Sequence, residues 1–179
     1  MAQHVIVDGY NLLGFLHAGG AGSSFAGEAA REGLLKDLSV YHLRKGHPLT
    51  VVFDGWRDGF PTERREFRSG VEVRYSRRGE RADQVIQRLA MQLGRDCAVV
   101  SSDREVTDCA RQAGAFVMGA AEFAEKLRNS WSGPAFSSWR KEGDGDGDDD
   151  RRRRSNDKKG NPRKLPKAVR ARQRKLRGF

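Results

Sequence analysis

The sequence has little cysteine and no long apolar run, and each scarcity excludes a class of protein. Only two cysteines occur in the 179 residues, Cys97 and Cys109, which is too few for a disulfide framework and too isolated for a zinc motif. We interpret both as small buried residues in a reducing compartment. No apolar run approaches the roughly 20 residues of a membrane span, and the apolar start is too short for a signal peptide. The sequence therefore predicts a cytoplasmic protein with no membrane partner.

The sequence also lacks the motifs of common nucleotide-binding and nucleophilic sites. The Gly-rich segment at residues 18–27 is not followed by Gly-Lys-Ser/Thr, so it is not a phosphate-binding loop. The four histidines are scattered along the chain, and no reactive-cysteine motif or catalytic lysine is recognisable. We expect no small-molecule cofactor.

Positive charge is concentrated at one end of the chain. Residues 140–179 hold 16 of the 34 Lys and Arg residues and 7 of the 24 Asp and Glu residues, a net charge of +9, whereas residues 1–139 carry a net +1. Six acids among three glycines occupy residues 142–150, but they lack the Gly and Glu of a calcium loop at its sixth and twelfth positions. With so few apolar residues, 132–179 is predicted to be a disordered tail behind a folded domain of residues 1–131.

Apolar runs and amphipathic stretches alternate through the first 131 residues. Buried strands are predicted at 4–8, 49–54, 97–103 and 115–118, and an edge or half-exposed strand at 71–76. Four helices are predicted. One spans 28–45, one begins after Asp83, one follows the 97–103 strand and ends at about residue 112, and one spans 120–130. This alternation predicts an α/β domain with a mainly parallel central sheet.

Acidic residues stand where several of these elements begin or end. Asp8, Asp54 and Asp103 each end an apolar run, and Asp83, three residues after Glu80, begins a helix expected to start at the same edge of the sheet. Each acid taken alone has a structural alternative as a turn or helix-start residue. Several converging carboxylates, however, repel one another unless a divalent cation neutralises them, and oxygen ligands favour Mg²⁺ or Mn²⁺. Such an ion can activate water against a phosphodiester.

Three polar residues accompany the acids. Asn11 can place an amide beside Asp8 or cap the helix that follows. Ser101 and Ser102 could donate hydrogen bonds at the site, and an equally good alternative is that they are merely polar residues at a strand end.

An aromatic and basic segment follows the second strand. Residues 55–70, predicted to be a loop, interleave aromatic side chains with arginines, which is typical of surfaces that stack bases and hold phosphates of single-stranded RNA. The alternative is that these aromatics pack back on the domain. The candidate RNA-binding residues are Trp56, Arg57, Arg64, Arg65, Arg68, Arg77 and Arg78.

Four strings carry a family resemblance: Val-Asp-Gly-Tyr-Asn at 7–11, Val-Phe-Asp-Gly at 52–55, Glu-x-x-Asp at 80–83 and Val-Ser-Ser-Asp at 100–103. Over about residues 3–130 the chain resembles the YacP-type NYN-domain proteins, which are PIN-like nucleases. The resemblance implies a PIN-like three-layer sandwich and a metal-dependent endoribonuclease. It places Asp8, Asp83 and Asp103 in the metal site, Asn11 beside them, and Asp54 and Glu80 at further metal-site positions. Because YacP-like members include a ribosome-associated enzyme that cleaves mRNA, it also implies RNA, and mRNA on the ribosome, as partners.

Three functions are compatible with these patterns to different degrees. The preferred one is a Mg²⁺- or Mn²⁺-dependent endoribonuclease acting on single-stranded or ribosome-associated RNA. The alternative is a non-catalytic RNA- or ribosome-binding protein that keeps the fold, although a binder has no reason to retain a repulsive acid cluster. A receiver-like phosphoacceptor is disfavoured, because the first strand lacks a paired aspartate and no lysine ends a late strand.

Overall fold

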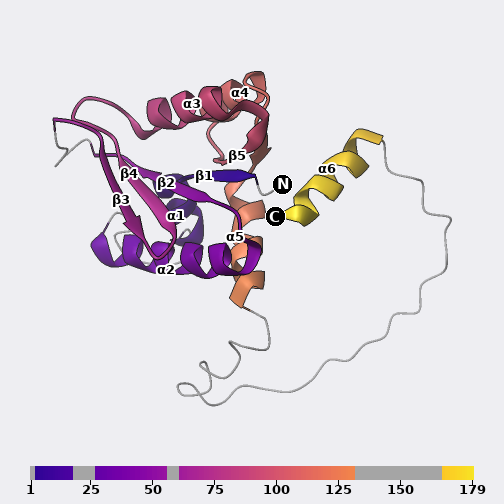
Figure 1. Ribbon diagram of the computed structural model, residues 1–179, viewed down its shortest axis with the longest axis horizontal. Helices are drawn as coiled ribbons and strands as arrows, with labels where there is room; N and C mark the ends of the chain where they lie inside the picture. The colour runs from indigo at the N-terminus through magenta and orange to yellow at the C-terminus, as the bar shows by residue number, and fades with distance from the viewer. Residues whose placement is uncertain (1–2, 18–26, 56–60, 132–166) are drawn as a thin grey trace, which may run out of the picture. The chain divides into compact units, whose positions relative to one another are not determined.

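A single six-stranded sheet forms the centre of the domain (Figure 1). The computed structural model describes residues 3–17, 27–55, 61–131 and 167–179. The strand order is β3-β4-β2-β1-β5-β6, and all neighbours are parallel except β3 and β4. The strands are β1 (His4–Asp8), β2 (Leu49–Phe53), β3 (Arg64–Arg68), β4 (Val71–Tyr75), β5 (Cys97–Val100) and β6 (Phe116–Met118).

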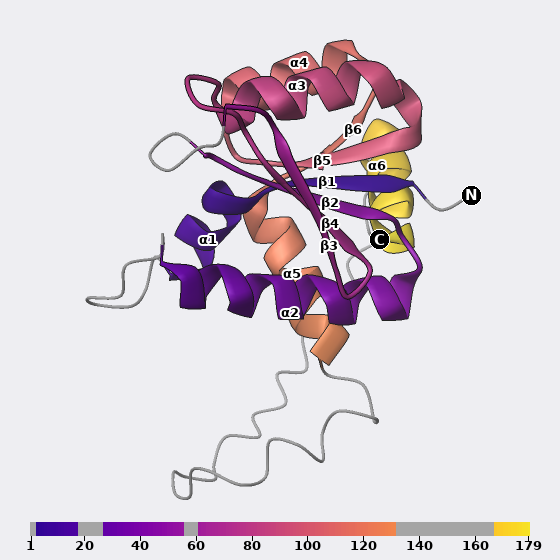
Figure 2. The same cartoon turned by 60° about the vertical axis from the view of Figure 1, so that its left-hand side comes forward.

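Helices cover both faces of this sheet, so the domain has three layers (Figure 2). One face carries α3 (Ala82–Leu93) and α4 (Arg104–Gln112), with a short 3-10 turn at Gly94–Asp96. The other face carries α1 (Gly9–His17), α2 (Glu28–Lys45) and α5 (Ala120–Trp131). The predicted α/β sandwich with a mainly parallel sheet is confirmed.

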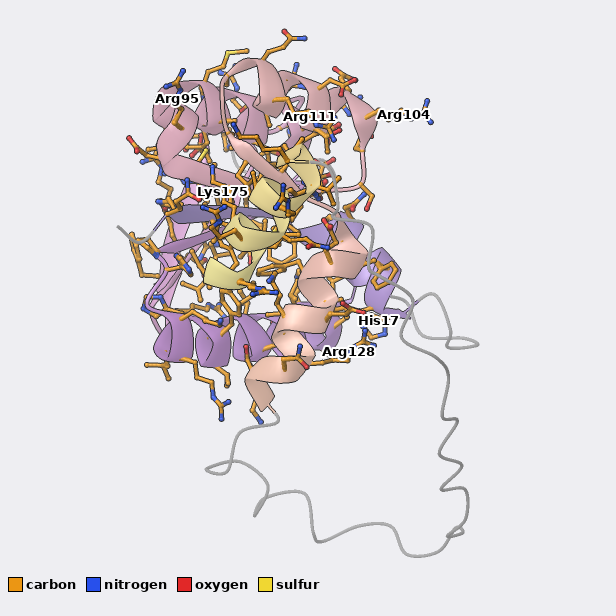
Figure 3. All side chains as sticks on the ribbon, turned by 90° about the vertical axis from the view of Figure 1, so that its right-hand side faces the viewer. His17, Arg95, Arg104, Arg111, Arg128 and Lys175 are labelled. Atoms are coloured by element: carbon orange, nitrogen blue, oxygen red, sulfur yellow. The ribbon has the colours of Figure 1, made fainter. Side chains whose placement is uncertain are left out.

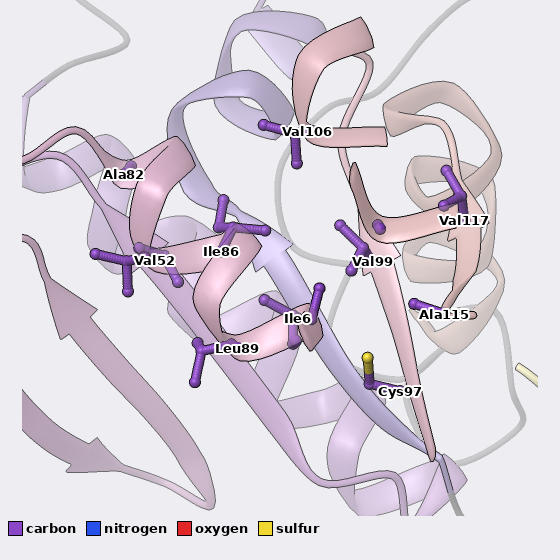
Figure 4. Close-up of a cluster of buried hydrophobic side chains, with 13 residues drawn as sticks. Ile6, Val52, Ala82, Ile86, Leu89, Cys97, Val99, Val106, Ala115 and Val117 are labelled. Atoms are coloured by element: carbon purple, nitrogen blue, oxygen red, sulfur yellow. The ribbon is translucent and has the colours of Figure 1, made fainter. Parts of the chain in front are cut away.

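The central strands are buried on both faces, as their continuous apolar sequences predict. Ile6 of β1, Val52 of β2 and Val99 of β5 pack against Val85 and Ile86 of α3 (Figure 4). Cys97 belongs to the same cluster, and both cysteines are free thiols. This core fixes the positions of three parallel strands whose carboxyl ends carry the candidate site.

The predicted loop at residues 55–70 is wrong over its second half. Residues Arg64–Arg68 form β3, which pairs antiparallel with β4, so β3 and not β4 is the edge strand. Ser69 (φ 49°) and Gly70 (φ 82°) form the two-residue connection, and positive φ at both positions is typical of tight hairpins. The strand was missed because Arg-Arg-Glu-Phe-Arg has no alternating apolar face.

The predicted tail also contains regular structure. α6 spans Lys167–Gly178, a helix that the sequence patterns did not predict. Its arginine, lysine, alanine, glutamine and leucine residues are strong helix formers, a preference that a low apolar content conceals. The chain divides into two compact units, residues 1–133 and 134–179. The acidic block at 142–150 and the arginines at 151–154 lie outside the described residues. No helix in the described part of the chain is long and apolar enough to cross a membrane.

Candidate functional site

Asp8 lies at the carboxyl end of β1, between the ends of β2 and β5. Its side chain is buried, with 7% of its surface exposed. One carboxylate oxygen accepts a hydrogen bond from the Asn11 backbone N–H at 3.1 Å, and the other accepts one from the Ser101 hydroxyl at 3.0 Å. Burial raises the pKa of Asp8 to about 6, the two hydrogen bonds oppose that rise, and the negative charges of Asp83 and Asp103 add to it. Asp8 is therefore a poorly solvated carboxylate held near other acids.

Asp103 approaches Asp8 through Ser101. The Ser101 hydroxyl, which donates to Asp8, accepts a hydrogen bond from the Asp103 backbone N–H at 3.1 Å. One Asp103 carboxylate oxygen caps α4, accepting from the backbone N–H of Glu105 at 2.7 Å and of Val106 at 3.3 Å. The helix-start alternative is thus real for Asp103, but it uses one oxygen and leaves the charge beside Asp8.

Asn11 and Ser102 tie the same strand ends together. The Asn11 side-chain oxygen accepts a hydrogen bond from the Ser102 backbone N–H at 2.9 Å, which links the start of α1 to the loop after β5. The Ser102 hydroxyl in turn accepts from the Ala120 backbone N–H at 3.2 Å, at the start of α5. Both residues therefore fix the loops that carry Asp8 and Asp103.

Asp83 brings a third acid from the first turn of α3. Burial raises its pKa, an ion pair with Arg81 (Nη2 to Oδ2, 2.5 Å) lowers it, and the charges of Asp103, Glu105 and Asp54 raise it again. Sequence reasoning missed Glu105, because its proximity to Asp83 depends on how the starts of α3 and α4 face each other. It also missed Arg81, although Arg81 is only two residues before Asp83. We name Asp8, Asp54, Asp83, Asp103 and Glu105 the acidic edge.

Asp54 lies at the margin of the acidic edge, at the end of β2. The buried Ser76 hydroxyl donates to its carboxylate at 3.2 Å and accepts from the Gly55 backbone N–H at 3.0 Å. Its charge acts on Asp83, whereas the charges that raise the pKa of Asp8 come from Asp83 and Asp103. Asp54 is therefore one strand removed from the centre of the group.

Glu80 is engaged elsewhere. It is buried, and its carboxylate accepts from Arg88 of α3 at 2.6 Å and pairs with Arg77 at 3.4 Å. Arg88 also binds Glu63 at 2.6 Å, so it connects the turn before α3 to the residues leading into β3. The role of Glu80 in a metal site stays a prediction, and the contacts of Glu80 are those of an ion-pair network.

The arginines predicted to bind RNA are spread over β3 and the turn before α3. On β3, Arg64 pairs with Glu66 (2.6 Å), Arg65 with Glu63 (3.1 Å), and Arg68 with Glu66 (3.2 Å) and Glu32. Solvent-exposed pairs of this kind are weak and can be exchanged for phosphate. Arg78 is exposed, and Trp56 and Arg57 lie outside the described residues.

Two exposed side chains add to these candidates. Phe67 of β3 is 79% exposed, and it lies across from Glu72, two positions along the hairpin from Arg65 and Arg74. Arg104 follows Asp103 directly and extends outward from the start of α4 (Figure 3). A flat aromatic ring on the edge strand and an arginine beside Asp103 are suited to contact unpaired bases and phosphates.

The donor set of the acidic edge fits a hard divalent cation. Its side chains offer carboxylate oxygen, with hydroxyl and amide groups beside them, and neither sulfur nor imidazole. Among the described residues, no three His, Cys, Asp or Glu side chains already lie close enough to enclose an ion. Mg²⁺ commonly keeps several waters and takes only one or two carboxylates, so Asp8 with one neighbouring aspartate would suffice.

The comparisons with known proteins agree with this fold. The family model described as the YacP-like NYN domain matches residues 5–170. The chain belongs to the YacP-like NYN domain family, a family of PIN-like nuclease domains. The match also extends well beyond the expected residues 3–130 and includes part of the predicted tail. No curated protein matches the chain.

Two solved structures are similar to the chain, both of Rae1 (YacP) from Bacillus subtilis. The crystal structure of a variant with one tryptophan replaced by leucine is 26% identical, with a TM-score of 0.58 over 72% of this chain and 76% of that chain. The crystal structure of Rae1 itself is 26% identical, with a TM-score of 0.57 over 71% of this chain and 74% of that chain.

Proposed function

We propose that the protein is a metal-dependent endoribonuclease that hydrolyses phosphodiester bonds in unpaired RNA, with mRNA on the ribosome as the substrate class. The observation that carries the proposal is the convergence of Asp8, Asp83 and Asp103 from three separate segments. Ser101 links Asp8 to Asp103 by hydrogen bonds, and the charges of Asp83 and Asp103 raise the pKa of Asp8. In a protein that only bound RNA, such a group would lower the affinity for RNA, because RNA is itself an anion.

The residues at this end of the sheet have two kinds of role in the proposal: some would hold the metal, and others position the residues that do. Asp8, Asp83 and Asp103 would hold Mg²⁺ or Mn²⁺, with Asp54 and Glu80 as further candidates. The ion, when bound, would supply a water of lowered pKa and stabilise negative charge on the phosphate. Ser101 holds the Asp8 carboxylate and the Asp103 backbone in place, and Asn11 fixes the loop after β5.

Removal of the metal is the direct test. A short unpaired RNA should be cut internally by the purified protein with Mn²⁺, remain intact with excess EDTA, and be cut again when Mn²⁺ is restored. Because Asp8 must lose its proton to bind a cation and its pKa is raised to about 6, Mn²⁺ affinity should fall as the pH drops from 8 to 5.5.

The outcomes separate the function classes. Cleavage in excess chelator would refute the metal requirement. Binding of RNA and Mn²⁺ without any cleavage would support the non-catalytic binding protein instead.

Replacing Phe67 by Ala should weaken the binding of unpaired RNA by about fivefold or more, since base stacking on an aromatic ring contributes roughly 1–3 kcal/mol. Duplex RNA, whose bases are not available for stacking, should bind as before. Fluorescence anisotropy with both RNAs measures the two affinities. Leu43→Ala is the matched control, because Leu43 has the same exposure of 79% but lies on α2, on the opposite face of the sheet. Equal losses on the two RNAs would contradict stacking.

A further inference from the structure

The acidic edge contains a cation that belongs to the protein itself. The guanidinium of Arg81 contacts the Asp83 carboxylate at 2.5 Å, and Arg81 is 61% exposed while Asp83 is 17% exposed. Two residues separated by one position on the chain thus form a pair that is open to solvent on the arginine side only. Because an arginine is always charged, Asp83 is partly neutralised whatever the pH.

The start of α3 does not depend on the Arg81 side chain. The Gln84 side-chain oxygen accepts a hydrogen bond from the Arg81 backbone N–H at 3.2 Å, and the Gln84 backbone N–H donates to the Arg81 carbonyl at 3.1 Å. Both bonds involve the backbone of Arg81 and neither involves its side chain. The guanidinium therefore does not stabilise the helix start, and it contacts Asp83.

A guanidinium on Asp83 Oδ2 and a divalent cation at the same carboxylate compete, because each cation lowers the negative charge that attracts the other. The negative charges of Asp103, Glu105 and Asp54 act on Asp83. An incoming cation is therefore attracted by several carboxylates, whereas Arg81, among the described residues, pairs with Asp83 alone. An ion pair whose arginine is largely exposed is weakened by solvent, and a divalent ion at several acids would displace it. The released guanidinium would then stand beside the site, and its planar fork fits phosphate oxygens.

We propose that Arg81 is the internal counter-ion of Asp83 in the metal-free protein, and that a bound metal releases its guanidinium to hold an RNA phosphate. The inference rests on the proposed function, since it needs a metal at the acidic edge. Metal and RNA then favour each other's binding, and by thermodynamic linkage the two effects are equal in size. The metal-free protein is held in a form with low affinity for substrate.

Binding measurements on Arg81→Gln test the first half of the proposal without any turnover. Mn²⁺ should bind the variant about threefold more tightly than the parent, because no guanidinium competes for Asp83. Arg78→Gln is the matched control, because it removes the same charge from an exposed side chain three residues earlier. Its effect on Mn²⁺ affinity should be less than half of the effect of Arg81→Gln. Electron paramagnetic resonance of free Mn²⁺ gives these affinities.

The second half is tested with an unpaired phosphorothioate RNA, checked for integrity on a gel after each measurement. Without metal, Arg81→Gln should bind the RNA as the parent does, whereas with saturating Mn²⁺ it should bind about fivefold more weakly. Arg81→Lys, which keeps the charge, should restore part of the difference. Arg78→Gln should weaken RNA binding equally with and without Mn²⁺.

The outcomes distinguish this inference from the proposed function. If Mn²⁺ fails to bind the parent protein, both are overturned. If Mn²⁺ binds the parent and RNA is cut, but Arg81→Gln leaves Mn²⁺ affinity unchanged or lowers it, only the role of Arg81 is overturned. A loss of RNA affinity in Arg81→Gln that is the same with and without Mn²⁺ would also overturn it.

Discussion

Replacing Asp8 by Asn is expected to abolish RNA cleavage, by at least roughly 100-fold, while making the metal-free protein more stable. The loss follows because the amide fills the volume of the carboxylate but carries no charge to hold a cation. The gain in stability follows because Asp8 is buried and ionised at pH 8 although burial raises its pKa to about 6. The two effects have opposite signs, which a merely damaged protein would not show.

The sign of the stability change depends on pH in a defined way. Folded Asp8 holds its proton more tightly than unfolded Asp8, whose pKa is near 3.8. The parent protein therefore loses stability as the pH rises from about 4 to above 6, by about 3 kcal/mol at most. Asp8→Asn lacks this loss, so its melting temperature should exceed that of the parent by about 5 °C at pH 8 and by little at pH 4.

The measurements are thermal unfolding in EDTA at both pH values and cleavage of a short RNA with Mn²⁺. Asp108→Asn is the control, because Asp108 is an exposed acid of α4 that pairs with Arg111, away from the acidic edge. It should cleave RNA like the parent. Asp83→Asn should also lose cleavage. Full activity of Asp8→Asn under limiting metal would remove Asp8 from the site.

The sequence was sufficient to predict which strands carry the acidic edge. In a parallel sheet the carboxyl ends of neighbouring strands meet at one edge, so Asp8, Asp54 and Asp103 had to lie near one another once their strands were recognised. The register between β1 and β5, in which Val7 pairs with Val100, places Asp8 and Ser101 at the same level. Short apolar runs ending in Asp are thus a strong positional signal.

The sequence could not predict the side-chain orientations at the helix starts. The spacing of Glu80 and Asp83 is compatible with two acids at one site, yet Glu80 pairs with Arg88, eight residues further along the chain. Glu105 appears from the sequence as an ordinary first-turn acid of α4, and only the packing of α3 against α4 brings its charge near Asp83. Such pairings depend on the packing between elements, which periodicity does not encode.

Edge strands and charged helices were hidden for a different reason. Neither β3 nor α6 has a buried face, so neither sequence shows a regular apolar pattern. The residues of β3 are exposed or partly exposed, and no residue of α6 is buried. Hydrophobic periodicity, the main signal for secondary structure, therefore predicts neither element. The turn residues Ser69 and Gly70 and the helix-forming composition of 167–178 were the remaining clues.

Removing residues 140–179 is expected to reduce RNA affinity by an order of magnitude or more at low salt, because this segment carries a net +9 against +1 for the rest of the chain. We propose that the tail is the main electrostatic contact to RNA or the ribosome. Each phosphate neutralised on a single strand contributes about 0.7 to the slope of log affinity against log salt. Truncation after Trp139 should therefore flatten this slope, whereas metal-dependent cleavage of a short RNA at saturating concentration should persist.

The helix α6 allows a sharper version of the experiment. It has six basic residues and no acid within Lys167–Gly178. Replacing Lys167, Arg170, Arg174, Lys175 and Arg177 by Gln keeps strong helix formers at each position but removes five charges. If α6 supplies the contacts, this full-length variant should lose most of the salt dependence that truncation loses. Helix content by circular dichroism controls for unfolding. An unchanged slope after truncation would mean that the tail does not contact nucleic acid, and a slope lost only on truncation would assign the contacts to residues before α6.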